Sequence, residues 1–445
     1  MIQSTSYVSR VRHFVSDNAL IVGGGVAGMQ AALDIANQGF KVYLVEKTSS
    51  IGGRMAAIDK TFPTLDCSAC ILTPKLSEVA RHPNIELLTY SEMEDASGHD
   101  GNFKVKIRRK ARYVHEGKCS GCGECAAICP SEVPSEFDER IGFRKAIYLP
   151  FPQATPAVYT IDMASCIGCK RCSKRCERGA IDYEMKDKII KLQVGAIIVA
   201  TGYKLFDVSE YPRLGYGRYH NVINAMEYER LINAAGPTHG HLIRLSDGKM
   251  PKNIGFIQCV GARDVNKGSP YCSRVCCMYG IKNAVMAKEH DPEAEVTIYY
   301  ADIRAFGKGF EEFYEMAKTR FGVHFVKGRV GEVMEDSETQ DLLVEVEDIM
   351  SAHLTEARHD MLVICPGLKP PDGLDAVAKK LKLHQSIDGY LDIHDSFLAP
   401  VETSIPGVFT CGCADGPKDI PDSVTAGSAA AMRATIILSR AGDLL

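Results

Sequence analysis

Two runs of four cysteines constrain this chain more than any other feature of its sequence. The runs are Cys119-x2-Cys122-x2-Cys125-x3-Cys129 and Cys166-x2-Cys169-x2-Cys172-x3-Cys176. A tight turn with thiols at i, i+3 and i+6 can wrap three corners of one tetrahedral ligand set. Zinc usually takes two separated C-x2-C pairs, so the spacing favours [4Fe-4S] clusters over a zinc ribbon or a set of disulfides.

The spacing matches that of bacterial two-cluster ferredoxins, in which the fourth cysteine of each run binds the other cluster. It predicts one cluster bound by Cys119, Cys122, Cys125 and Cys176, and a second bound by Cys166, Cys169, Cys172 and Cys129. Glu177 stands where a second proline would follow Cys176, which loosens the turn but keeps the ligand set. We therefore expect an inserted ferredoxin domain.

The rest of the composition excludes several classes of function. The chain has 445 residues and a formal net charge of −4, which gives no sign of a nucleic-acid or anionic-membrane partner. No signal peptide is recognisable, and no apolar run approaches the ~18 residues that span a bilayer. The 17 cysteines of so long a chain cannot form a small secreted disulfide scaffold. We expect a cytoplasmic protein without direct membrane insertion.

A dinucleotide-binding motif precedes the cysteine runs. The predicted order is strand, glycine turn, helix and strand, over residues 18–22, 23–28, 29–37 and 41–45. Gly23 allows the turn, Gly25 lets the backbone approach a pyrophosphate, and Gly28 lets the helix pack on the strand. Glu46 ends the second strand, where an acid would bind a ribose. An ordinary turn is the alternative, but the complete context favours a nucleotide site.

Later segments favour FAD over NAD. Gly52-Gly53-Arg54 resembles the loop after the ribose acid in two-dinucleotide flavoproteins, and Thr201-Gly202 ends a buried strand as in that fold. Gly412 follows the last flavin-domain strand, and a helix starting around residues 422–426 would face the flavin. Cys413 replaces the acid usual there, which shifts the ribityl contact to Asp415, Asp419 or backbone. The predicted FAD contacts are Gly23, Gly25, Gly28, Glu46, Gly52, Gly53, Arg54, Thr201, Gly202, Gly412, Asp419 and Ser423.

A second nucleotide-binding-like unit has lost its glycines. Its first strand, 253–258, runs into Cys259 instead of a glycine loop, and Cys272, Cys276 and Cys277 open the following helix. This leaves poor room for a pyrophosphate. We predict a third [4Fe-4S] site at these four cysteines, whereas the alternative is that Cys276 and Cys277 merely pack in the helix. Electrons would then reach the flavin through clusters, not by hydride transfer from a nicotinamide.

The predicted fold is α/β, a two-dinucleotide-binding, thioredoxin-reductase-like flavoprotein with an inserted two-cluster ferredoxin domain. The predicted domains are the first part of the FAD domain at 15–112, the ferredoxin insert at 113–184, the Ala-Thr-Gly strand at 185–205, the second nucleotide-binding-like domain at 206–365 and the last part of the FAD domain at 366–445.

Together these residues resemble the flavoprotein (A-type) subunits of heterodisulfide reductases and related subunits of sulfur-metabolism complexes. The matching stretches are 21–28, 64–75, 110–114, 259–277 and 416–422, of which Cys-x12-Cys-x3-Cys-Cys is the most specific. The resemblance implies FAD, [4Fe-4S] clusters, and partners like the B and C subunits that handle disulfide, thiol or persulfide chemistry. It extends only in part to flavin-based bifurcation, because longer members carry further N-terminal and C-terminal domains that are not recognised here.

The resemblance also singles out two residues beside the flavin. It implies that Lys282 approaches flavin N5, whereas the alternative is a solvated surface lysine; Glu229 is a weaker candidate for an acid near the ring. Cys67 and Cys70 are a redox dithiol, ligands of a cluster completed by another chain, or packing thiols. Cys365, Cys411 and Cys413 are expected to be small buried residues.

Three functions follow from these features. The first is an FAD and iron–sulfur electron-transfer subunit of a heterodisulfide-reductase-like complex. The second is an NAD(P)H-dependent FAD/iron–sulfur reductase, which predicts a second GxGxxG that the sequence does not contain. The third is a pure electron relay without substrate chemistry of its own.

Overall fold

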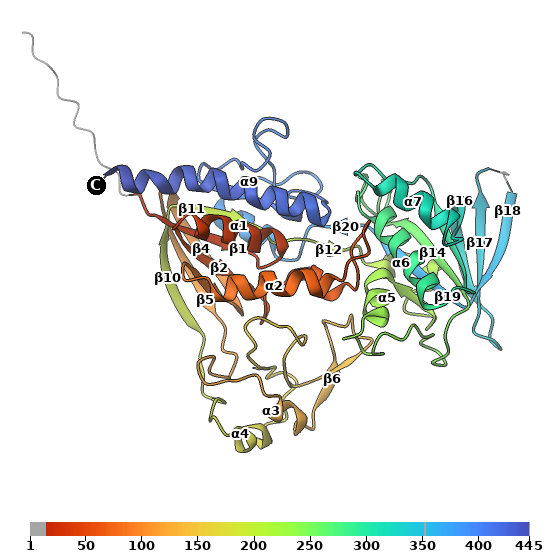
Figure 1. Cartoon of the computed structure of the whole chain (residues 1–445), viewed down its shortest axis with the longest axis horizontal. Coiled ribbons are helices and arrows are strands. Elements are labelled where there is room, and N and C mark those ends of the chain that lie inside the picture. Colours follow the sequence, from red (N-terminus) through yellow and green to blue (C-terminus); the bar gives the residue numbers. More distant parts are fainter. Residues whose placement is uncertain (1–14, 351–352, 445) are drawn as a thin grey trace, which may run out of the picture.

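The computed structural model of the chain describes residues 15–350 and 353–444. Two α/β units lie side by side, and a smaller third unit projects from the first (Figure 1). Residues 351–352 and 445, which belong to the predicted domains 206–365 and 366–445, lie outside the described part.

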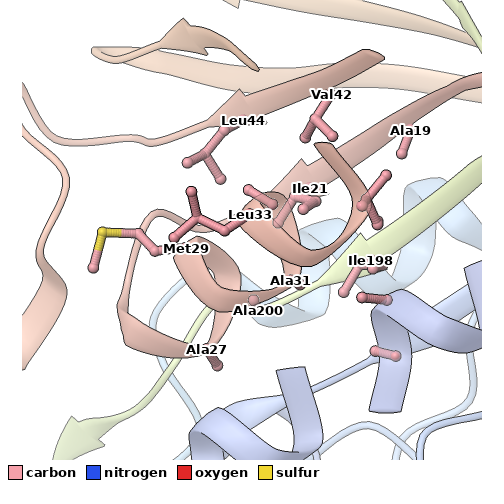
Figure 2. Close-up of a cluster of buried hydrophobic side chains, with 14 of the residues drawn as sticks. Ala19, Ile21, Ala27, Met29, Ala31, Leu33, Val42, Leu44, Ile198 and Ala200 are labelled. Carbon is pink, nitrogen blue, oxygen red and sulfur yellow. The ribbon is translucent and has the colours of Figure 1, made fainter. Parts of the chain in front are cut away.

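The first unit contains a parallel five-stranded sheet of order β21-β11-β1-β2-β3. Its strands are β1 (Asn18–Val22), β2 (Lys41–Val45), β3 (Ile85–Leu88), β11 (Ala196–Val199) and β21 (Val408–Thr410). The helices α1 (Val26–Asn37), α2 (Ser68–Arg81) and α9 (Ile420–Leu438) belong to the same unit. Parallel strands covered on both faces read as continuous apolar runs, as β1 and β11 do. In the core, Ile21, Leu44 and Ile198 are fully buried with Met29 and Leu33 of α1 (Figure 2).

A three-stranded antiparallel sheet of order β10-β5-β4 completes the first unit. Its strands are β4 (Ser91–His99), β5 (Asn102–Arg109) and β10 (Lys188–Val194), and α8 (Leu374–Leu381) packs against β4. Arg109 of β5 pairs with Lys188 of β10. The chain between these two residues therefore leaves and rejoins the first unit at one point.

This intervening chain forms the third unit. It is closed at its base by an antiparallel bridge between Val114 and Ile181, where His115 N donates to Ala180 O at 2.7 Å. Its elements are α3 (Glu124–Ala127), β6 (Glu132–Pro134), β7 (Phe143–Lys145), β8 (Ile147–Tyr148), β9 (Thr160–Ile161) and α4 (Arg171–Arg175). The unit occupies the segment predicted as the insert, although the domain limits themselves stay predictions.

The second α/β unit contains a seven-stranded sheet of order β13-β19-β14-β15-β16-β17-β18. Pairing is parallel from β13 to β16 and antiparallel from β16 to β18. The strands are β13 (Val222–Asn224), β14 (Asn253–Val260), β15 (Glu295–Tyr300), β16 (His324–Glu335), β17 (Leu342–Asp348), β18 (His353–His359) and β19 (Met361–Pro366). The helices are α5 (Ala225–Ile232), α6 (Cys276–His290) and α7 (Phe310–Thr319).

Two short strands carry the chain between the units. β12 (Lys204–Leu205) and β20 (Leu368–Lys369) pair antiparallel, so both crossings run side by side. Short 3-10 turns complete the chain, namely η1 (Gly53–Ala57), η2 (Val208–Glu210), η3 (Pro212–Leu214), η4 (Gly412–Ala414) and η5 (Ser439–Leu444). In the part of the chain that the structure describes, no helix combines the length and apolarity needed to cross a membrane.

Candidate flavin and iron–sulfur sites

The glycine turn after β1 has the geometry of a phosphate cradle. Gly23 has φ +116°, and a Cβ there would meet Ala200 O at 2.2 Å; a Cβ on Gly28 would meet Gly23 O at 1.9 Å. A Cβ on Gly25, in contrast, would have no atom within 4 Å. Gly25 is the N-cap of α1 and offers no side-chain cap, so the first N–H groups of the helix remain available to an anion. The turn is tight where it must be and open where a pyrophosphate would lie.

Glu46, which follows β2, stabilises this turn by hydrogen bonds. Its side chain is buried, Oε2 accepts a hydrogen bond from Gly24 N at 2.8 Å, and Oε1 accepts from Thr48 N and Oγ1 at 2.8 Å. The carboxylate therefore holds the turn as well as standing at the predicted ribose position. Two of its acceptor sites are already engaged by backbone N–H groups.

The predicted loop after Glu46 packs onto the same turn. Gly52 N donates to Gly24 O at 2.9 Å, and a Cβ on Gly53 would meet Gly25 Cα at 2.9 Å. Arg54 instead forms an ion pair with Glu139 of the inserted unit at 2.8 Å. Its position thus links two units.

The opposite end of the candidate flavin site carries unpaired buried polar atoms. Thr201 Oγ1 and Asp415 Oδ1 are buried and have no hydrogen-bond partner among the described residues. Gly202, with φ +73°, is open on its Cβ side. Buried orphan polar groups are costly and point to a missing partner. The hydroxyl, phosphate and ring groups of FAD would satisfy them, so the residues fit this cofactor.

Asp415 and Asp419, the two predicted candidates for the acidic contact after Gly412, have different surroundings. Asp419 Oδ1 caps α9 by accepting from Asp422 N at 2.8 Å. Asp415 pairs with Lys418 at 2.7 Å through one oxygen and keeps the other unpaired, while burial raises the pKa of its carboxyl. Ser423 is buried in the first turn of α9.

We expect Gly25→Val to abolish flavin binding while the apoprotein still folds. The backbone of Gly25 is extended (φ −76°), so valine is sterically allowed there, and its side chain would fill only the open space of the cradle. Because valine is a poorer N-cap residue than glycine, the substitution should lower the free energy of unfolding of the apoprotein by about 1 kcal/mol. Bound flavin, read from visible absorbance after gel filtration, and denaturant unfolding of the apoprotein measure the two effects.

Gly28→Ala is the matched variant, and it should lower the unfolding free energy by about 3 kcal/mol through overpacking. Normal flavin content in Gly25→Val would contradict the assignment.

The two cysteine runs of the inserted unit have the same local structure. Gly121 (φ +73°) and Gly168 (φ +70°) each precede the second cysteine of a run. The third cysteine of each run lies on a short helix, α3 or α4. Arg175 Nε donates to Glu124 Oε2 at 2.8 Å, which joins the two helices. The repeated spacing in the sequence is therefore a repeated turn in the structure.

One cavity in this unit gathers a complete predicted ligand set. Its lining includes Cys129, Cys166, Cys169 and Cys172. The fourth cysteine of the first run thus lies with the first three of the second. Cys119, Cys122 and Cys125 of the other set lie close enough for their charges to interact.

The spacing of these thiols matters for the kind of group they suit. Among residues 15–350 and 353–444, no group of three or more His, Cys, Asp or Glu side chains is arranged to hold a metal ion. A four-iron cluster is larger than a single ion and spaces its thiolates farther apart. A cavity surrounded by four cysteines fits the larger group.

The third predicted set begins at a bulge in β14. Cys259 has φ +64°, and the register of β14 with β19 shifts between Ile257 and Val260. A left-handed conformation is strained for a side chain larger than glycine, and bulges re-aim side chains. Cys259 and Cys277 are close enough to Cys276 to raise the pKa of its buried thiol. The structure thus brings three of the four cysteines close together.

Positive charge surrounds this group. The neighbouring Cys276 side chain, together with the guanidinium groups of Arg263 and Arg329, lowers the pKa of Cys259. Cys272 influences the same Arg263, and its Sγ accepts from Arg274 N at 3.4 Å. The fourth thiol therefore lies at the edge of the same group.

The Cβ side of Gly261, next to Cys259, is filled, whereas the Cβ side of Gly25 in the first unit is open. A Cβ on Gly261 would meet the ring of Phe206 at 2.1 Å, and Gly268 packs against Gly261 O. Phe206 is buried, and its ring therefore occupies the space in front of the only glycine left in the turn 259–263. This differs from the open space at Gly25 and explains physically why a pyrophosphate would be poorly accommodated.

Lys282 and Glu229 form a buried ion pair between α6 and α5. They are 1% and 3% exposed, and Lys282 Nζ donates to Glu229 Oε1. Glu229 Oε2 accepts from Asp59 N at 3.0 Å. Burial and the charge of Glu229 raise the pKa of the Asp59 carboxyl. The interpretation of Lys282 as a solvated surface lysine is wrong, and its place beside the flavin stays a prediction.

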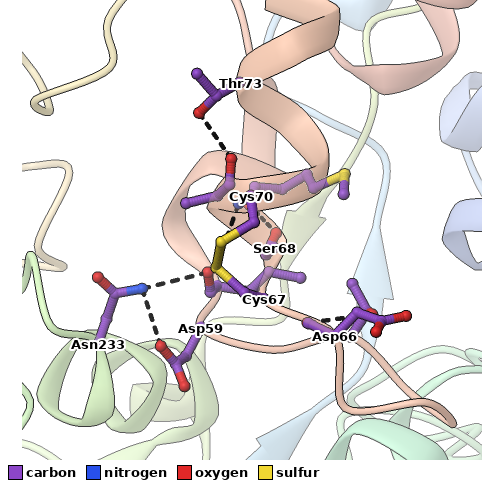
Figure 3. Close-up of a disulfide and its surroundings, with 11 residues drawn as sticks. Asp59, Asp66, Cys67, Ser68, Cys70, Thr73 and Asn233 are labelled. Carbon is purple, nitrogen blue, oxygen red and sulfur yellow. Dashed lines mark hydrogen bonds between the residues drawn. A yellow bond between two sulfur atoms is a disulfide. The ribbon is translucent and has the colours of Figure 1, made fainter.

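The five unassigned cysteines divide into two kinds. Cys365, Cys411 and Cys413 are buried, as predicted. Cys67 and Cys70 are exposed at the start of α2 and form a disulfide (Figure 3). Their interpretation as packing thiols is therefore wrong.

Sequence reasoning missed several residues that join the units. Arg230 is 1% exposed and pairs with Asp138 of the inserted unit at 3.0 Å. Asp59 connects the first unit to Glu229 through its backbone N–H. Each contact joins positions about a hundred or more apart in the chain, and no local motif signals such a pairing.

Comparisons with known proteins agree with this architecture. The family described as pyridine nucleotide-disulphide oxidoreductase matches residues 17–431. The chain belongs to this oxidoreductase family. Its fold is similar to the thioredoxin reductases of T. acidophilum (TM-score 0.53, 14% identity, 94% of this chain and 98% of that one) and Lactococcus lactis (0.54, 16%, 95% and 99%). The predicted α/β, thioredoxin-reductase-like flavoprotein fold is confirmed.

Curated relatives are much more similar in sequence. The chain is 53% identical to the A subunit of the H(2):CoB-CoM heterodisulfide,ferredoxin reductase of Methanothermobacter marburgensis, over 95% of this chain and 64% of that one. It is 53% identical to the iron-sulfur A subunit of the CoB--CoM heterodisulfide reductase of Methanocaldococcus jannaschii, over 96% and 65%. The predicted similarity to the A subunits of heterodisulfide reductases is confirmed. The chain spans slightly less than two thirds of the length of these relatives.

Proposed function

We propose that this member of the family is an FAD- and iron–sulfur-containing electron-transfer subunit of a heterodisulfide-reductase-like complex in the cytoplasm. Electrons would pass between [4Fe-4S] clusters and FAD. The observation that carries the proposal is the end of β14, where thiols and the ring of Phe206 stand in place of an open glycine cradle. The inserted unit is proposed to be the ferredoxin module, with its two ligand sets as predicted.

Each group of residues has a distinct task in this proposal. FAD supplies the exchange between one-electron and two-electron transfer, and the clusters supply one-electron transfer. Gly25 and Gly202 leave room for the cofactor, and Thr201 and Asp415 offer it unpaired polar atoms. Cys259, Cys272, Cys276 and Cys277 would hold the third cluster, which would pass electrons between the flavin and the inserted unit. Lys282, fixed by Glu229, would place a positive charge beside the flavin ring.

The partners are proposed to resemble the B and C subunits of heterodisulfide reductases. Relatives are named as A subunits of such reductases, including that of a ferredoxin/F(420)H(2)-dependent enzyme from Methanosarcina acetivorans, which is 45% identical over 95% of this chain and 53% of that one. Around the cysteine runs, Ile167 and Phe143 are 69% and 72% exposed, and Cys122 and Cys169 are exposed. An apolar surface beside near-surface clusters suits docking of an electron-transfer partner. Bifurcation at the flavin belongs to the same proposal.

One observation favours the NAD(P)H-dependent alternative. A cavity at the carboxyl end of β14 is lined by the turn 259–263 itself, and also by Arg213 and Arg329. Arginines at the carboxyl ends of parallel strands are suited to phosphate groups. The proposal therefore has to be tested against nicotinamides directly.

The deciding experiment compares two electron donors under anaerobic conditions. We expect a reduced low-potential ferredoxin to bleach the flavin and the iron–sulfur absorbance of the purified chain. NADH and NADPH should act about 10²-fold more slowly, the loss expected for a reactant that is not held in register. Stopped-flow absorbance measures both rates on one preparation. Rapid bleaching by either nicotinamide would overturn the proposal and establish the alternative.

A further inference from the structure

The tip of the hairpin formed by β6 and β7 reaches out of the inserted unit and contacts both α/β units. The tip comprises residues 135–142, and β6 lies on the side of the inserted unit that faces α5 (Figure 1). Ile141 packs against the hydrophobic core of the second unit, and a Cβ on Gly142 would meet Pro237 at 2.9 Å. The tip contains no cysteine, so the predicted clusters do not account for these contacts.

Arg230 of the second unit is the centre of this contact. Its side chain is 1% exposed, and its Nε donates to Asp138 Oδ1 of the tip at 3.0 Å. Its Nη1 donates to Ala57 O of the first unit at 3.0 Å, and its Cζ lies 4.8 Å from the centroid of the Phe137 ring. A guanidinium presents its donors in a rigid planar fork, so it can hold two chain segments at a fixed relative position. Arg230 thus joins the tip to the first unit.

The segment that Arg230 holds in the first unit is η1, the predicted flavin loop. Ala57 is the last residue of η1 (Gly53–Ala57), which packs on the glycine turn after β1. At the other end of η1, Arg54 pairs with Glu139 of the tip at 2.8 Å. The tip therefore holds η1 at both ends, directly through Glu139 and indirectly through the guanidinium of Arg230.

The backbone of the tip is unusual for its sequence. Glu139 and Arg140 have φ +49° and +68°, and two consecutive left-handed residues in a hairpin turn are usually asparagine, aspartate or glycine. A left-handed conformation is unfavourable for longer side chains and persists where surrounding contacts impose it. The pairing of Glu139 with Arg54 is such a contact. It gives the acidic side chain a reason to stand at a position that favours glycine.

We infer that the tip of the inserted unit is a positioning element of the flavin site, with Arg230 and Glu139 as its positioning residues. The docked tip holds η1 against the glycine turn and so completes the cradle for FAD, and bound FAD in turn favours the docked tip. Because coupling between two equilibria is reciprocal, FAD binding and tip docking stabilise each other by the same factor. This coupling rests on the proposed function, because it requires FAD in the cradle.

The base of the inserted unit is attached to the first unit independently of the tip. Arg112 is 3% exposed and donates to Thr89 Oγ1 at 2.7 Å and to Ser49 O at 3.3 Å. An isolated bridge also joins Ile51 to Thr155. Loss of the tip contacts should therefore leave the inserted unit folded and attached, which makes the tip accessible to substitution.

Hydrogen–deuterium exchange of the full chain tests the coupling without any substitution. The purified chain is stripped of its flavin, and mass spectrometry follows exchange in peptides covering 53–57 and 135–142 with and without saturating FAD. We expect FAD to slow exchange in both segments about tenfold, within the range of typical coupled sites, and to leave β17 unchanged. Slower exchange at 53–57 alone would overturn the inference and leave the proposed function intact. A chain that binds no FAD would overturn both.

Two variants measure the reciprocal effect of the tip on the flavin. Asp138→Ala leaves the Nε of Arg230 without its carboxylate and should raise the Kd of FAD about tenfold. Glu139→Gln weakens a partly exposed ion pair and should raise the Kd about threefold. Fluorescence titration of the flavin-free full chain with FAD measures both values. A lower Kd in Glu139→Gln would show that Glu139 competes with the flavin for Arg54, and it would overturn the inference.

Glu132→Gln is the matched control for these variants. Glu132 pairs with Lys145 at 2.6 Å within the same hairpin but outside the tip. The control should keep the original Kd of FAD and the original exchange of 135–142. An unchanged Kd in both tip variants, or an equal rise in Glu132→Gln, would contradict the positioning role.

Discussion

Replacing Cys276 with serine should remove about four of about twelve irons per chain and leave the flavin in place. Cys276 is 1% exposed and interacts with both Cys259 and Cys277, so its loss should open the predicted ligand set. A serine oxygen is a harder and weaker ligand for this soft metal group. The eight cysteines of the inserted unit are untouched, and their two clusters should remain. Iron analysis and electron paramagnetic resonance of the reduced protein count the clusters directly.

Cys365→Ala is the matched control for this variant. Cys365 is fully buried in β19 of the same unit, and it belongs to no predicted ligand set. The control should keep about twelve irons. It also measures what the loss of a buried thiol alone does to stability. Unchanged iron in Cys276→Ser would rule out the third cluster.

The same variant tests how electrons reach the flavin. If the third cluster bridges the flavin and the inserted unit, flavin reduction by ferredoxin should slow markedly in Cys276→Ser, while the two remaining clusters are reduced at the original rate. Stopped-flow absorbance separates the two signals. Equal slowing of both would instead point to damage at the donor's docking surface.

Features encoded by neighbouring residues could be predicted from the sequence. The glycine turn from Gly23 to Gly28 and the two cysteine runs depend on spacings of a few residues, and local geometry fixes what such spacings can do. Phe206 illustrates what could not be predicted. Its ring fills the space before Gly261, but the two residues lie in separate loops and meet only after folding. The sequence indicated that the glycine-rich phosphate-binding turn after β14 is missing, but it did not indicate which side chain fills its space.

Choices between similar residues also depended on burial. Asp415 and Asp419 are both candidates in the sequence, and only the structure shows that Asp419 caps α9 while Asp415 keeps one buried oxygen unpaired. The sequence did not show whether Lys282 faces solvent, because the amphipathic pattern of α6 is weak. In the structure this helix is buried along most of its length. The partner that settles its position, Glu229, lies 53 residues earlier. Long-range pairing of this kind leaves no trace in a single sequence.

Lys282→Met should lower the free energy of unfolding by about 3–5 kcal/mol, because it leaves the carboxylate of Glu229 buried without its cation. Both side chains are almost fully inaccessible, at 2% and 5% exposure, so water cannot replace the lost partner. Urea unfolding of the flavin-free protein measures the loss without a contribution from cofactor binding. Adding Glu229→Leu to Lys282→Met should recover much of the lost stability, since an apolar pair of similar volume carries no buried charge.

Lys60→Met is the control, because Lys60 forms a partly exposed ion pair with Glu289. The pair is 3.0 Å long with side-chain exposures of 31% and 35%, and such a pair contributes about 1 kcal/mol or less. Comparable losses in Lys282→Met and Lys60→Met would contradict the buried charge pair, and with it the fixed cation that the proposed function places beside the flavin.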